Sequence, residues 1–589
     1  MLRTHTCGQL DKKDIDQEVE LCGWVHRRRD HGGVIFIDLR DRYGITQVKF
    51  NPEIKKETWQ EADKLRSEWV VRVKGKVVAR PEDMVNSKLS TGQVEVAVNE
   101  LEIYSRAQTP PFEIDEEKRI EINEEIRMKY RYLDLRKPEI AELILKRHYF
   151  VKFIREYLSS QGFAEIETPY LSKSTPEGAR DFLVPSRQQQ GKFYALPQSP
   201  QQYKQLLMIA GMDKYFQIAR CFRDEDTRGE RQAEFTQMDL EMSFVDREDV
   251  LNLTEDLFTK AIKEVFPEKE IMFQPWPRLS HQEAMLKYGT DKPDLRFGLE
   301  IRDLSDLVKD CQFQVFSEAV AKGGVVRALT ATGGAQLSRA QIDALTNFVS
   351  DFGAKGLAYI IVKDKELQSP IVKFLGEDLA WQIVKKMEAK TGDIIFFGAD
   401  TEKVVRESLG ALRNELASKL GLLDDNKLAF CFILDFPLFE EEVQDGYYNP
   451  EHHMFTNPRP EDAELLDKDP HKALSTQYDV SLNGVESAGG SIRIHDRRIQ
   501  EKIFDLIGFQ AEDKKRFSHF LKAFDYGVPP HGGIASGLER MLMAIMNKNS
   551  IREIIPFPKT GDGRDLMMES PSEVEEKQLK DLGLKLKKD

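Results

Sequence analysis

The sequence predicts an α+β protein of several domains, in which a small N-terminal barrel precedes a larger region of helices and hairpins with one inserted domain. Three observations support this. The chain has 589 residues, roughly four times the usual domain size. Its first hundred or so residues contain short strands separated by turns. In a central block, predicted helices and strands alternate, whereas the sequence on both sides of it is rich in predicted hairpins.

The N-terminal region, residues 1–106, is predicted to form a barrel. It contains five strand-like segments, VELCGWV, VIFIDLR, GITQVKF, EWVVRVKGKVV and GQVEVAV. Five short strands in so few residues are typical of a Greek-key barrel of the oligonucleotide-binding (OB) type. The charged, proline-containing segment 107–139 that follows is interpreted as a hinge.

From Ile140 to Tyr157 the apolar residues recur with helical spacing. We therefore predict a helix there, followed by the strand-like FAEIETPYL. Residues 140–288 form the first part of a large domain, and 426–560, where hairpin-rich sequence returns, form its second part. The block 289–425, with VVRALTATGG, LAYIIVKD and DIIFFGAD, is expected to be an inserted α/β domain. The charged tail 561–589 is expected to be helical or disordered.

Composition limits the classes of partner. With 86 Lys and Arg against 100 Asp and Glu, the net charge is −14, so a polyanion must be met by a local basic patch. The five cysteines are scattered without a CxxC pair, which favours a reducing compartment. No signal-like or membrane-length apolar run occurs, so we expect a soluble cytoplasmic protein.

The stretch FRDEDTRGERQAEFTQMD, residues 222–239, lies between two apolar segments. If EFTQMDLEMSF is a strand, one face carries Met238, Leu240, Met242 and Phe244, and the other carries Phe235, Gln237, Asp239 and Glu241. A polar face with one ring suits a stacked planar ligand, with a carboxylate for an amine and Arg223 beside it. The alternative is a solvated hairpin, since most charge runs are exposed.

Two glycine-containing segments predict a phosphate and metal site. In HGGIASGLERML a glycine-rich turn precedes a helix with Arg540 near its start, which suits an anion, although a packing turn would look the same. In YDVSLNGVESAGGSIRIHD, Asp479 and Glu486 could hold Mg²⁺ through oxygen ligands, or could be ordinary surface acids. The adjacent His452 and His453 carry little information alone.

The barrel sequence also contains a candidate nucleic-acid surface. In VIFIDLR, Phe36 alternates onto the polar face, close to the basic run at residues 26–29. A ring among charges is a stacking platform for a single-stranded base, and Gln47 could read a base edge. An edge-strand phenylalanine covered by a loop is the alternative.

Taken together, these segments resemble the three signature motifs of class II aminoacyl-tRNA synthetases. Motif 1 resembles the 140–157 helix with GFAEIETPYL, motif 2 resembles FRDEDTRGERQAEFTQMD, and motif 3 resembles GLERMLMAI. The match follows the right order over almost the whole chain. The preceding barrel restricts it to the subclass that charges aspartate, asparagine or lysine. TPEGARDFLVP, LPQSPQQYKQLL, HHMFTNP and GGSIRIHD are most similar to the bacterial-type aspartyl-tRNA synthetases.

The resemblance implies an antiparallel sheet with flanking helices, a homodimer, and ATP and Mg²⁺ as cosubstrate and cofactor. It implies catalytic roles for Arg223 and Arg540. ATP would be bound by Arg223, Asp224, Glu225, Gln232, Phe235, Glu486, Leu538, Glu539, Arg540 and Met541. Aspartate would be bound by Glu177, Ser199, Gln201, Lys204, Arg223, Asp239, His452, His453 and Arg493. Mg²⁺ would be held by Asp479 and Glu486, and the anticodon by Arg28, His31, Phe36 and Gln47.

The implied reaction joins L-aspartate to ATP as aspartyl-adenylate and transfers it to the 3′ end of tRNA-Asp. The position after Asp30 is His31, where members strict for tRNA-Asp commonly carry leucine, so charging of tRNA-Asn is a further hypothesis. An asparaginyl- or lysyl-tRNA synthetase is an alternative, although Lys204 with Arg493 suits an anionic side chain better. A non-catalytic RNA-binding paralogue is the other alternative, and it would be expected to lose Arg223, Glu486 and Arg540.

Overall fold

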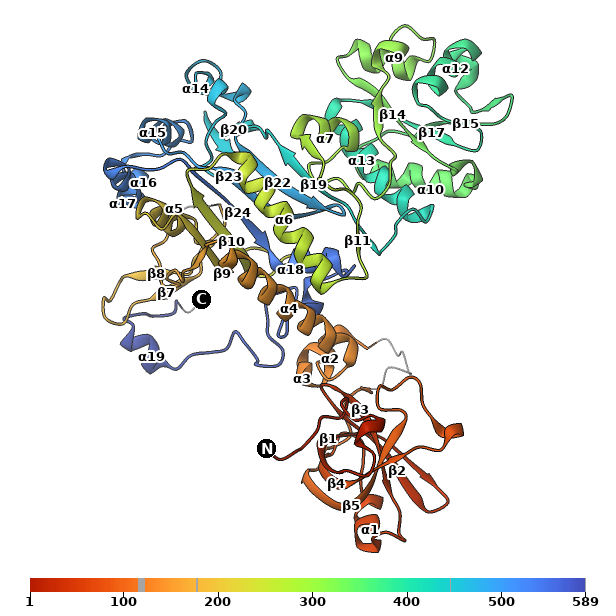
Figure 1. Ribbon diagram of the computed structural model, residues 1–589. Coiled ribbons are helices and arrows are strands. Elements are labelled where there is room, and N and C mark those ends of the chain that lie inside the picture. Colours follow the sequence, from red (N-terminus) through yellow and green to blue (C-terminus); the bar gives the residue numbers. More distant parts are fainter. Residues whose placement is uncertain (115–121, 176–177, 445, 588–589) are drawn as a thin grey trace. The chain divides into compact units, whose positions relative to one another are not determined.

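The computed structural model describes residues 1–114, 122–175, 178–444 and 446–587. The chain divides into two compact units, which we describe separately (Figure 1). The first contains Met1–Leu145 and Ile555–Ser572, and the second contains Lys146–Ile554 and Glu573–Asp589. None of the helices in the described part of the chain combines the length and apolar character needed to cross a membrane.

The first unit contains the predicted five-stranded barrel, which is closed in the order β1-β2-β3-β5-β4. Its elements are β1 (Glu18–His31), β2 (Val34–Asp41), β3 (Gly44–Phe50), α1 (Lys56–Asp63), β4 (Val70–Ala79) and β5 (Val94–Ser105). The alternation in β2 is as predicted, because Ile35, Ile37 and Leu39 lie in the barrel core while Phe36 is half-buried on the outside. The OB-type barrel is therefore confirmed.

Two short helices follow the barrel, α2 (Glu124–Lys129) and α3 (Arg131–Asp134). The side chain of Arg131 is buried, forms an ion pair of 2.6 Å with Asp134, and donates to the carbonyls of Ile555 and Pro556 at 2.9 Å each. These bonds attach residues 555–572 to the first unit.

The second unit is built on an eight-stranded sheet in the order β12-β19-β22-β23-β24-β10-β9-β6. Pairing is antiparallel except for β12 with β19 and β6 with β9. The strands are β6 (Ala164–Glu165), β9 (Lys214–Phe222), β10 (Glu234–Ser243), β12 (Arg278–Ser280), β19 (Phe430–Leu434), β22 (Gln477–Leu482), β23 (Val485–Ile492) and β24 (His531–Gly537).

Helices cover this sheet. Figure 1 shows α6 running across one of its faces. The flanking helices are α4 (Pro138–Ser160), α5 (Gln201–Ile209), α6 (Arg247–Val265) and α18 (Leu538–Ile545). Three more helices follow β23, namely α15 (Arg497–Leu506), α16 (Ala511–Arg516) and α17 (Ser518–Ala523), and α15 and α17 pack into a separate core with Phe439 and Phe455. Smaller elements are β7 (Leu183–Pro185), β8 (Phe193–Ala195), β11 (Glu270–Ile271), β18 (Lys427–Leu428), β20 (Phe439–Gln444), β21 (Tyr447–Pro450), α14 (Leu465–Lys468) and α19 (Glu576–Asp581).

The predicted inserted α/β fold is present as a second sheet, in the order β13-β14-β17-β15-β16. Alternate residues of β17 enter two separate cores, Ile394 and Phe396 in one and Ile395 and Phe397 in the other. Its strands are β13 (Ile301–Asp303), β14 (Val325–Ala331), β15 (Ala358–Val362), β16 (Leu367–Gln368) and β17 (Ile394–Asp400). Its helices are α7 (His281–Tyr288), α8 (Ser305–Val308), α9 (Gln314–Ala321), α10 (Arg339–Ser350), α11 (Val372–Leu375), α12 (Glu377–Lys386) and α13 (Glu402–Lys419).

Two local predictions were wrong. The strand expected over FAEIETPYL is reduced to the two residues of β6, followed by one further bond from the Ile166 amide to the Phe216 carbonyl at 3.1 Å. Pro169, which has no N–H, cannot extend this pairing. Phe244 does not continue the apolar face of β10. That strand ends at Ser243, and Phe244 turns out with φ 58° and a side chain 75% exposed.

Candidate active site

Four charged side chains meet on the polar face of β10, at the centre of the large sheet. Asp239 and Glu241 alternate onto this face, and Asp239 lies opposite Gln217 of β9. Lys204 reaches them from α5, and Arg493 from the residue after β23. All four are almost completely buried, with exposures of 0% for both acids, 1% for Lys204 and 2% for Arg493. A group of four buried charges requires close pairing, because an isolated buried charge is very unfavourable.

The pairing is direct. Lys204 Nζ lies 2.6 Å from Asp239 Oδ1 and 3.2 Å from Glu241 Oε2. Arg493 donates from Nε and Nη2 to the two oxygens of Glu241, at 2.8 and 3.2 Å. Asp239 Oδ2 is buried and has no hydrogen-bond partner within the described chain. One buried acceptor therefore remains available for a donor.

The environment gives the two carboxylates different pKa values. Burial opposes the charge of Glu241, but Arg493 and Lys204 outweigh it and lower the pKa of Glu241 to about 2. Burial is the dominant effect on Asp239, and it raises the pKa of that carboxyl in spite of Lys204. Glu241 is thus a firmly held anion, and Asp239 gains from an additional cation.

The remaining donors of Arg493 are also engaged. Nη1 lies 2.8 Å from both Ser491 Oγ and His453 Nε2, and Nη2 lies 3.3 Å from the carbonyl of Gly533. The Phe455 amide also points at His453, 3.2 Å from Nδ1. Burial and the Arg493 cation lower the pKa of His453 well below its usual range, and a neutral imidazole has one acceptor nitrogen. His453 can therefore accept from only one of these two donors.

A second group of predicted residues lies along the end of the β9–β10 hairpin. The Arg223 guanidinium stands over the ring of Phe235, 5.1 Å from its centroid, and Arg223 Nε is buried without a hydrogen-bond partner. Arg540 Nη1 lies 4.0 Å from Glu486 Oε1, and its Nε lies 3.4 Å from the carbonyl of Glu230. The structure thus brings Arg223 to the ring predicted to stack on adenine, and Arg540 to one of the predicted metal ligands.

Other predicted nucleotide contacts are differently placed. Glu225 forms an ion pair of 3.8 Å with Arg231, the Asp224 amide donates to the Arg180 carbonyl at 3.0 Å, and Gln232 is buried. The carboxylate of Glu539 is buried, forms an ion pair of 2.8 Å with Arg147 and accepts from the Thr236 amide at 3.0 Å.

The side chains of Leu538 and Met541 are fully buried in the protein core. Contact of either residue with a nucleotide would therefore fall to its backbone.

Asp479 and Glu486 lie on neighbouring strands, β22 and β23, on either side of an irregularity in their register. Asp479 accepts from Gln477 Nε2 at 2.8 Å and contacts His452 Nε2 at 3.1 Å. Burial, and then the Asp479 carboxylate, raise the pKa of Glu486. Among the described residues no group of three or more His, Cys, Asp or Glu could hold a metal ion. Two carboxylates do fit Mg²⁺ as it is usually bound together with substrate phosphates.

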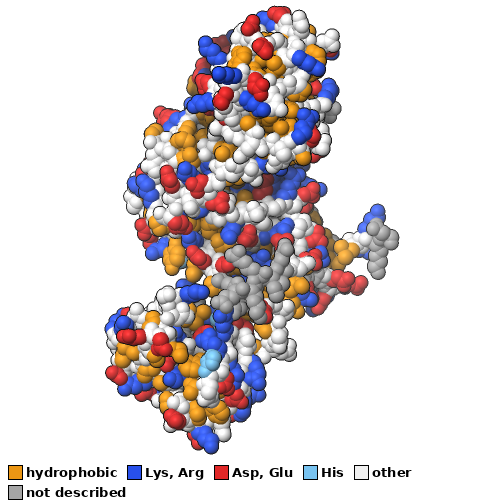
Figure 2. Space-filling view, turned by 90° about the vertical axis from the view of Figure 1, so that its right-hand side faces the viewer, with side chains coloured by type: hydrophobic (Ala, Val, Ile, Leu, Met, Phe, Trp, Pro, Cys, Tyr) orange, Lys and Arg blue, Asp and Glu red, His pale blue; other side chains and the backbone are white. Residues whose placement is uncertain are grey.

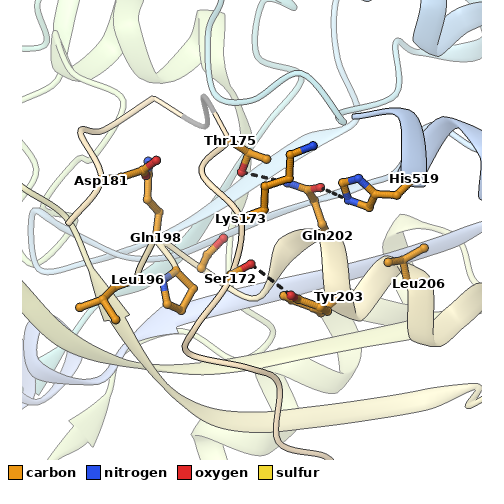
Figure 3. A pocket seen from close by; sticks show the side chains of 12 residues that line it. Ser172, Lys173, Thr175, Asp181, Leu196, Gln198, Gln202, Tyr203, Leu206 and His519 are labelled. Atoms are coloured by element: carbon orange, nitrogen blue, oxygen red, sulfur yellow. Dashed lines mark hydrogen bonds between the residues drawn. The ribbon is translucent and has the colours of Figure 1, made fainter. Parts of the chain in front are cut away.

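A cavity of about 200 Å³ adjoins the residues predicted to bind aspartate (Figure 3). Ser199 lines it. Gln202 bridges across it, donating to Thr175 Oγ1 at 3.1 Å and contacting His519 Nε2 at 3.0 Å. Gln201 is buried, with Nε2 lacking a hydrogen-bond partner. Glu177 lies outside the described residues.

Sequence reasoning missed Glu241 as a site residue. It had been assigned to the same polar strand face as Asp239, and that periodicity was the available signal. Its bidentate bond to Arg493, 252 positions away in the chain, depends on sheet topology that local sequence does not contain.

On the outer face of the barrel, Phe36 lies 6.2 Å from the ring of His31 and within 5.8 Å of Lys49 Nζ. Gln47 donates to Glu95 at 2.7 Å, and Arg28 Nη2 lies 2.5 Å from Asp63. The structure brings Phe36 and His31 together, whereas Gln47 and Arg28 have acidic partners within the barrel. Figure 2 shows Lys and Arg interspersed with Asp and Glu over the visible face. Nucleic acid would therefore have to bind at a local cluster of basic and aromatic side chains.

The sheet, the buried charges and the barrel together define a class of protein. Residues 123–561 match the family model of tRNA synthetases class II (D, K and N), and residues 19–104 match that of the OB-fold nucleic acid binding domain. The chain therefore belongs to the class II tRNA synthetases, a family of ligases, as the sequence motifs predicted.

Particular relatives cover the whole chain. It is 51% identical to an aspartate–tRNA(Asp/Asn) ligase of Syntrophomonas wolfei, over 100% of both chains. It is 52% identical to one of Rubrobacter xylanophilus, over 99% of this chain and 97% of that one.

Solved structures support the fold. Asparaginyl-tRNA synthetase from Pyrococcus horikoshii, complexed with asparaginyl-adenylate, is 19% identical with a TM-score of 0.60, covering 95% of this chain and 99% of that one. Aspartyl-tRNA synthetase from Entamoeba histolytica is 20% identical with a TM-score of 0.57, covering 95% and 91%.

Proposed function

We propose that the protein activates L-aspartate with ATP and transfers it to the 3′ end of tRNA-Asp and tRNA-Asn. The observation that carries the choice of amino acid is the buried pair of cations, Lys204 and Arg493, beside Asp239 with its free oxygen. A side-chain carboxylate suits Arg493, and an ammonium suits Asp239 Oδ2. An amide or an amine at the same position would bring N–H donors to these cations, which themselves have only donors.

In the proposed binding mode, the substrate's side-chain carboxylate replaces His453 at Arg493 Nη1, while Glu241 keeps the guanidinium in position. Lys204 supports the same carboxylate from the other side. Ser199, Gln201 and His452 line the pocket, and Glu177 completes the proposed set. The site is organised before the substrate enters, which reduces the cost of ordering it.

Activation needs no protein nucleophile. The α-carboxylate of aspartate attacks the α-phosphorus of ATP, and Arg223 stabilises the charge that develops on the phosphate oxygens. Phe235 supports the adenine ring, and Arg540 meets the far end of the triphosphate. Mg²⁺, held with ATP by Asp479 and Glu486, would neutralise charge on the leaving pyrophosphate. The terminal ribose hydroxyl of tRNA then attacks the adenylate and releases AMP.

The barrel is proposed to bind the anticodon loop, with Phe36 stacking on a base. The two tRNAs differ in that loop at the third anticodon position, G or C, whose edges present different donors and acceptors. His31 lies beside Phe36, close enough to influence that choice. The names of the full-length relatives include both tRNAs, which supports the wider range.

We also propose a homodimer in the cytoplasm, with the motif 1 segment at the interface. In support, β6 is an edge strand, and Tyr149, Tyr170 and Leu171 are about half exposed along this segment. Sedimentation equilibrium of the wild type and of a Tyr149→Glu variant tests this, because a charge at the interface should shift the mass towards the monomer.

Steady-state charging of tRNA-Asp and tRNA-Asn transcripts, each with aspartate, asparagine and lysine, tests the function. Aspartate alone should support charging, and both tRNAs should accept it. His31→Leu should shift the preference towards tRNA-Asp. His5→Leu should not, because the His5 amide bonds to Glu20 near the opposite end of β1 from His31. Charging with asparagine or lysine would contradict the amino-acid assignment. Negligible wild-type activity on tRNA-Asn would refute only the proposed charging of that tRNA.

A further inference from the structure

The root of the inserted domain lies against the hairpin that carries Asp479 and Glu486. Ser481 Oγ of β22 donates to the carbonyl of Pro293 at 3.0 Å, and both groups are buried. In the turn between β22 and β23, a Cβ on Gly484 would lie 3.4 Å from Asp294 Cβ. The segment Thr290–Gly298 is therefore packed directly on the predicted metal-binding hairpin. Figure 1 shows α7, which precedes it, at the side of β19.

The inserted domain holds the same segment from the other side. Arg413 of α13 is fully buried, and its Nη2 donates to the carbonyls of Asp294, Phe297 and Gly298 at 2.5, 3.0 and 3.1 Å. Its guanidinium stands over the ring of Phe297, 4.3 Å from the centroid. Asp294 is further fixed by its ion pair of 2.7 Å with Arg296. A segment bonded on both sides presents its side chains from a rigid base.

One side chain of this segment, Lys292, belongs to the electrostatic surroundings of the hairpin. Its Nζ lies 3.0 and 3.2 Å from the two oxygens of Asp291, and the side chain is 45% exposed. Partial burial opposes its charge, but Asp291, and after it Glu486 and Asp479, outweigh that effect and raise the pKa of Lys292. The backbone places this lysine at the hairpin, because the Lys292 carbonyl lies 4.0 Å from the Cβ position of Gly484 in the turn between β22 and β23. The exposed ammonium is therefore carried by a segment that packs on the hairpin of Asp479 and Glu486.

We propose that Lys292 is a further ATP-binding residue, which contacts the β- and γ-phosphate end of the triphosphate and the pyrophosphate that leaves. The inference rests on the proposed function, since Asp479 and Glu486 mark this end of the nucleotide. Mg²⁺ bound by one or two carboxylates usually takes substrate phosphate oxygens and waters as its other ligands. Those oxygens remain anionic after one metal is bound, and an exposed ammonium on a flexible stem is a common phosphate partner.

The ion pair with Asp291 is compatible with this role. Exposed ion pairs between neighbouring residues contribute little to stability, so a polyphosphate can displace Asp291 from Lys292 at small cost. Asp291 would then keep the ammonium near the hairpin between turnovers. The inserted domain, through Arg413 and the 290–298 segment, would supply a substrate contact to the large sheet on which it is mounted.

Aspartate-dependent ATP–pyrophosphate exchange, with separate KM values for ATP, pyrophosphate and aspartate, tests the assignment. Lys292→Met should raise KM for ATP and for pyrophosphate about tenfold or more, the usual loss for one charge-assisted hydrogen bond, and should leave KM for aspartate within about twofold. Lys292→Arg should recover most of the loss. Lys287→Met, at an exposed lysine on α7 whose partner Glu283 is 3.9 Å away, is the matched control.

The outcomes distinguish a failure of the proposed function from a failure of the role of Lys292. Exchange activity absent from the wild type would refute the proposed function itself. An active wild type with unchanged KM values for ATP and pyrophosphate in Lys292→Met would refute only the role of Lys292. A similar rise in all three KM values with a lower kcat and a lower melting temperature would also refute the role of Lys292, because a lysine needed only for the fold would give that pattern. The role of Lys292 would be supported if Lys292→Met raised KM only for ATP and pyrophosphate and Lys292→Arg restored both values.

Discussion

Arg493→Leu is the most direct test of how the buried charges serve both the fold and the substrate. In the wild type two cations face two carboxylates. The substitution leaves Lys204 alone with Asp239 and Glu241, and it removes both hydrogen bonds that Arg493 donates to Glu241. Breaking a buried pair by removing one partner costs about 3–5 kcal/mol of stability.

The same substitution removes the proposed partner of the substrate carboxylate. An unpaired buried charge costs about 2–5 kcal/mol, and 1.36 kcal/mol corresponds to a factor of ten. We therefore expect kcat/KM for aspartate in ATP–pyrophosphate exchange to fall by a factor of roughly 30 to several thousand. ATP binding, measured by calorimetry, should change little, because Arg223, Phe235 and Arg540 are untouched.

A double variant separates the two effects. Arg493→Leu with Glu241→Gln restores a balance of one cation and one carboxylate, so much of the lost stability should return while aspartate activation stays low. Arg498→Leu is the matched control, because the side chain of Arg498 is 90% exposed. Wild-type kcat/KM for aspartate in Arg493→Leu would refute the assignment. Recovery of activity in the double variant would show that Arg493 acts only through the fold.

Three further predictions concern other parts of the chain. Phe36→Ala should weaken tRNA charging by about 1–3 kcal/mol, the cost of losing one base stack, and leave adenylate formation unchanged. Glu241 has a folded-state pKa of about 2, which is below its ordinary value. The ionised carboxylate therefore contributes its full stabilisation, roughly 3 kcal/mol, above about pH 4.5. This stabilisation is lost as the pH falls towards 2. Between about pH 5 and pH 3 the melting temperature should therefore fall less in Glu241→Gln than in the wild type. Arg413→Leu should destabilise the protein by about 2 kcal/mol or more, because the buried carbonyls of Asp294 and Phe297 and the part-buried carbonyl of Gly298 lose their donor.

Each of these has its own control. Tyr43→Ala removes an exposed barrel ring and should spare charging; equal losses in charging and activation by Phe36→Ala would indicate a misfolded barrel instead. If the melting temperature of Glu241→Gln fell with decreasing pH as much as that of the wild type, the carboxylate of Glu241 would not be held as a charged group. Arg339→Leu, at a side chain 69% exposed, should leave the melting temperature nearly constant, and the same result for Arg413→Leu would contradict the proposed anchoring.

Local periodicity was sufficient for much of the fold. Alternation in β2 and β10 placed Ile35 and Ile37 inside the barrel and Asp239 on the polar face, because the two-residue period of a strand is a property of the strand itself. It failed at Phe244, where a residue with φ 58° ends the period. Strand periodicity cannot indicate where a strand stops when no glycine or proline marks the end.

Contacts between distant segments could not be predicted in this way. The sequence indicated that Lys204, Asp239 and Arg493 belong to one site only through the family resemblance. It did not indicate that Glu241 holds Arg493, or that Gln47 and Arg28 on the barrel are engaged by Glu95 and Asp63. Such pairs depend on which strands are neighbours, and that information lies in the order of the sheet and the barrel.

The balance of charge in the pocket bears on how aspartate could be selected over asparagine. Each buried cation already has a carboxylate, so the pocket is close to neutral and a substrate enters by exchanging partners. Aspartate can make that exchange in full, with its ammonium at Asp239 Oδ2 and its side-chain carboxylate in place of His453 at Arg493 Nη1. Asparagine can place its ammonium in the same way and its amide oxygen at one cation. Its amide nitrogen then brings donors to the other cation, and both Arg493 and Lys204 have only donors. We infer that discrimination arises mainly from this unfavourable donor–donor contact. A His453→Ala variant, which lacks the group that aspartate displaces, should therefore bind aspartate at least as tightly without gaining affinity for asparagine; a measured gain for asparagine in that variant would contradict the inference.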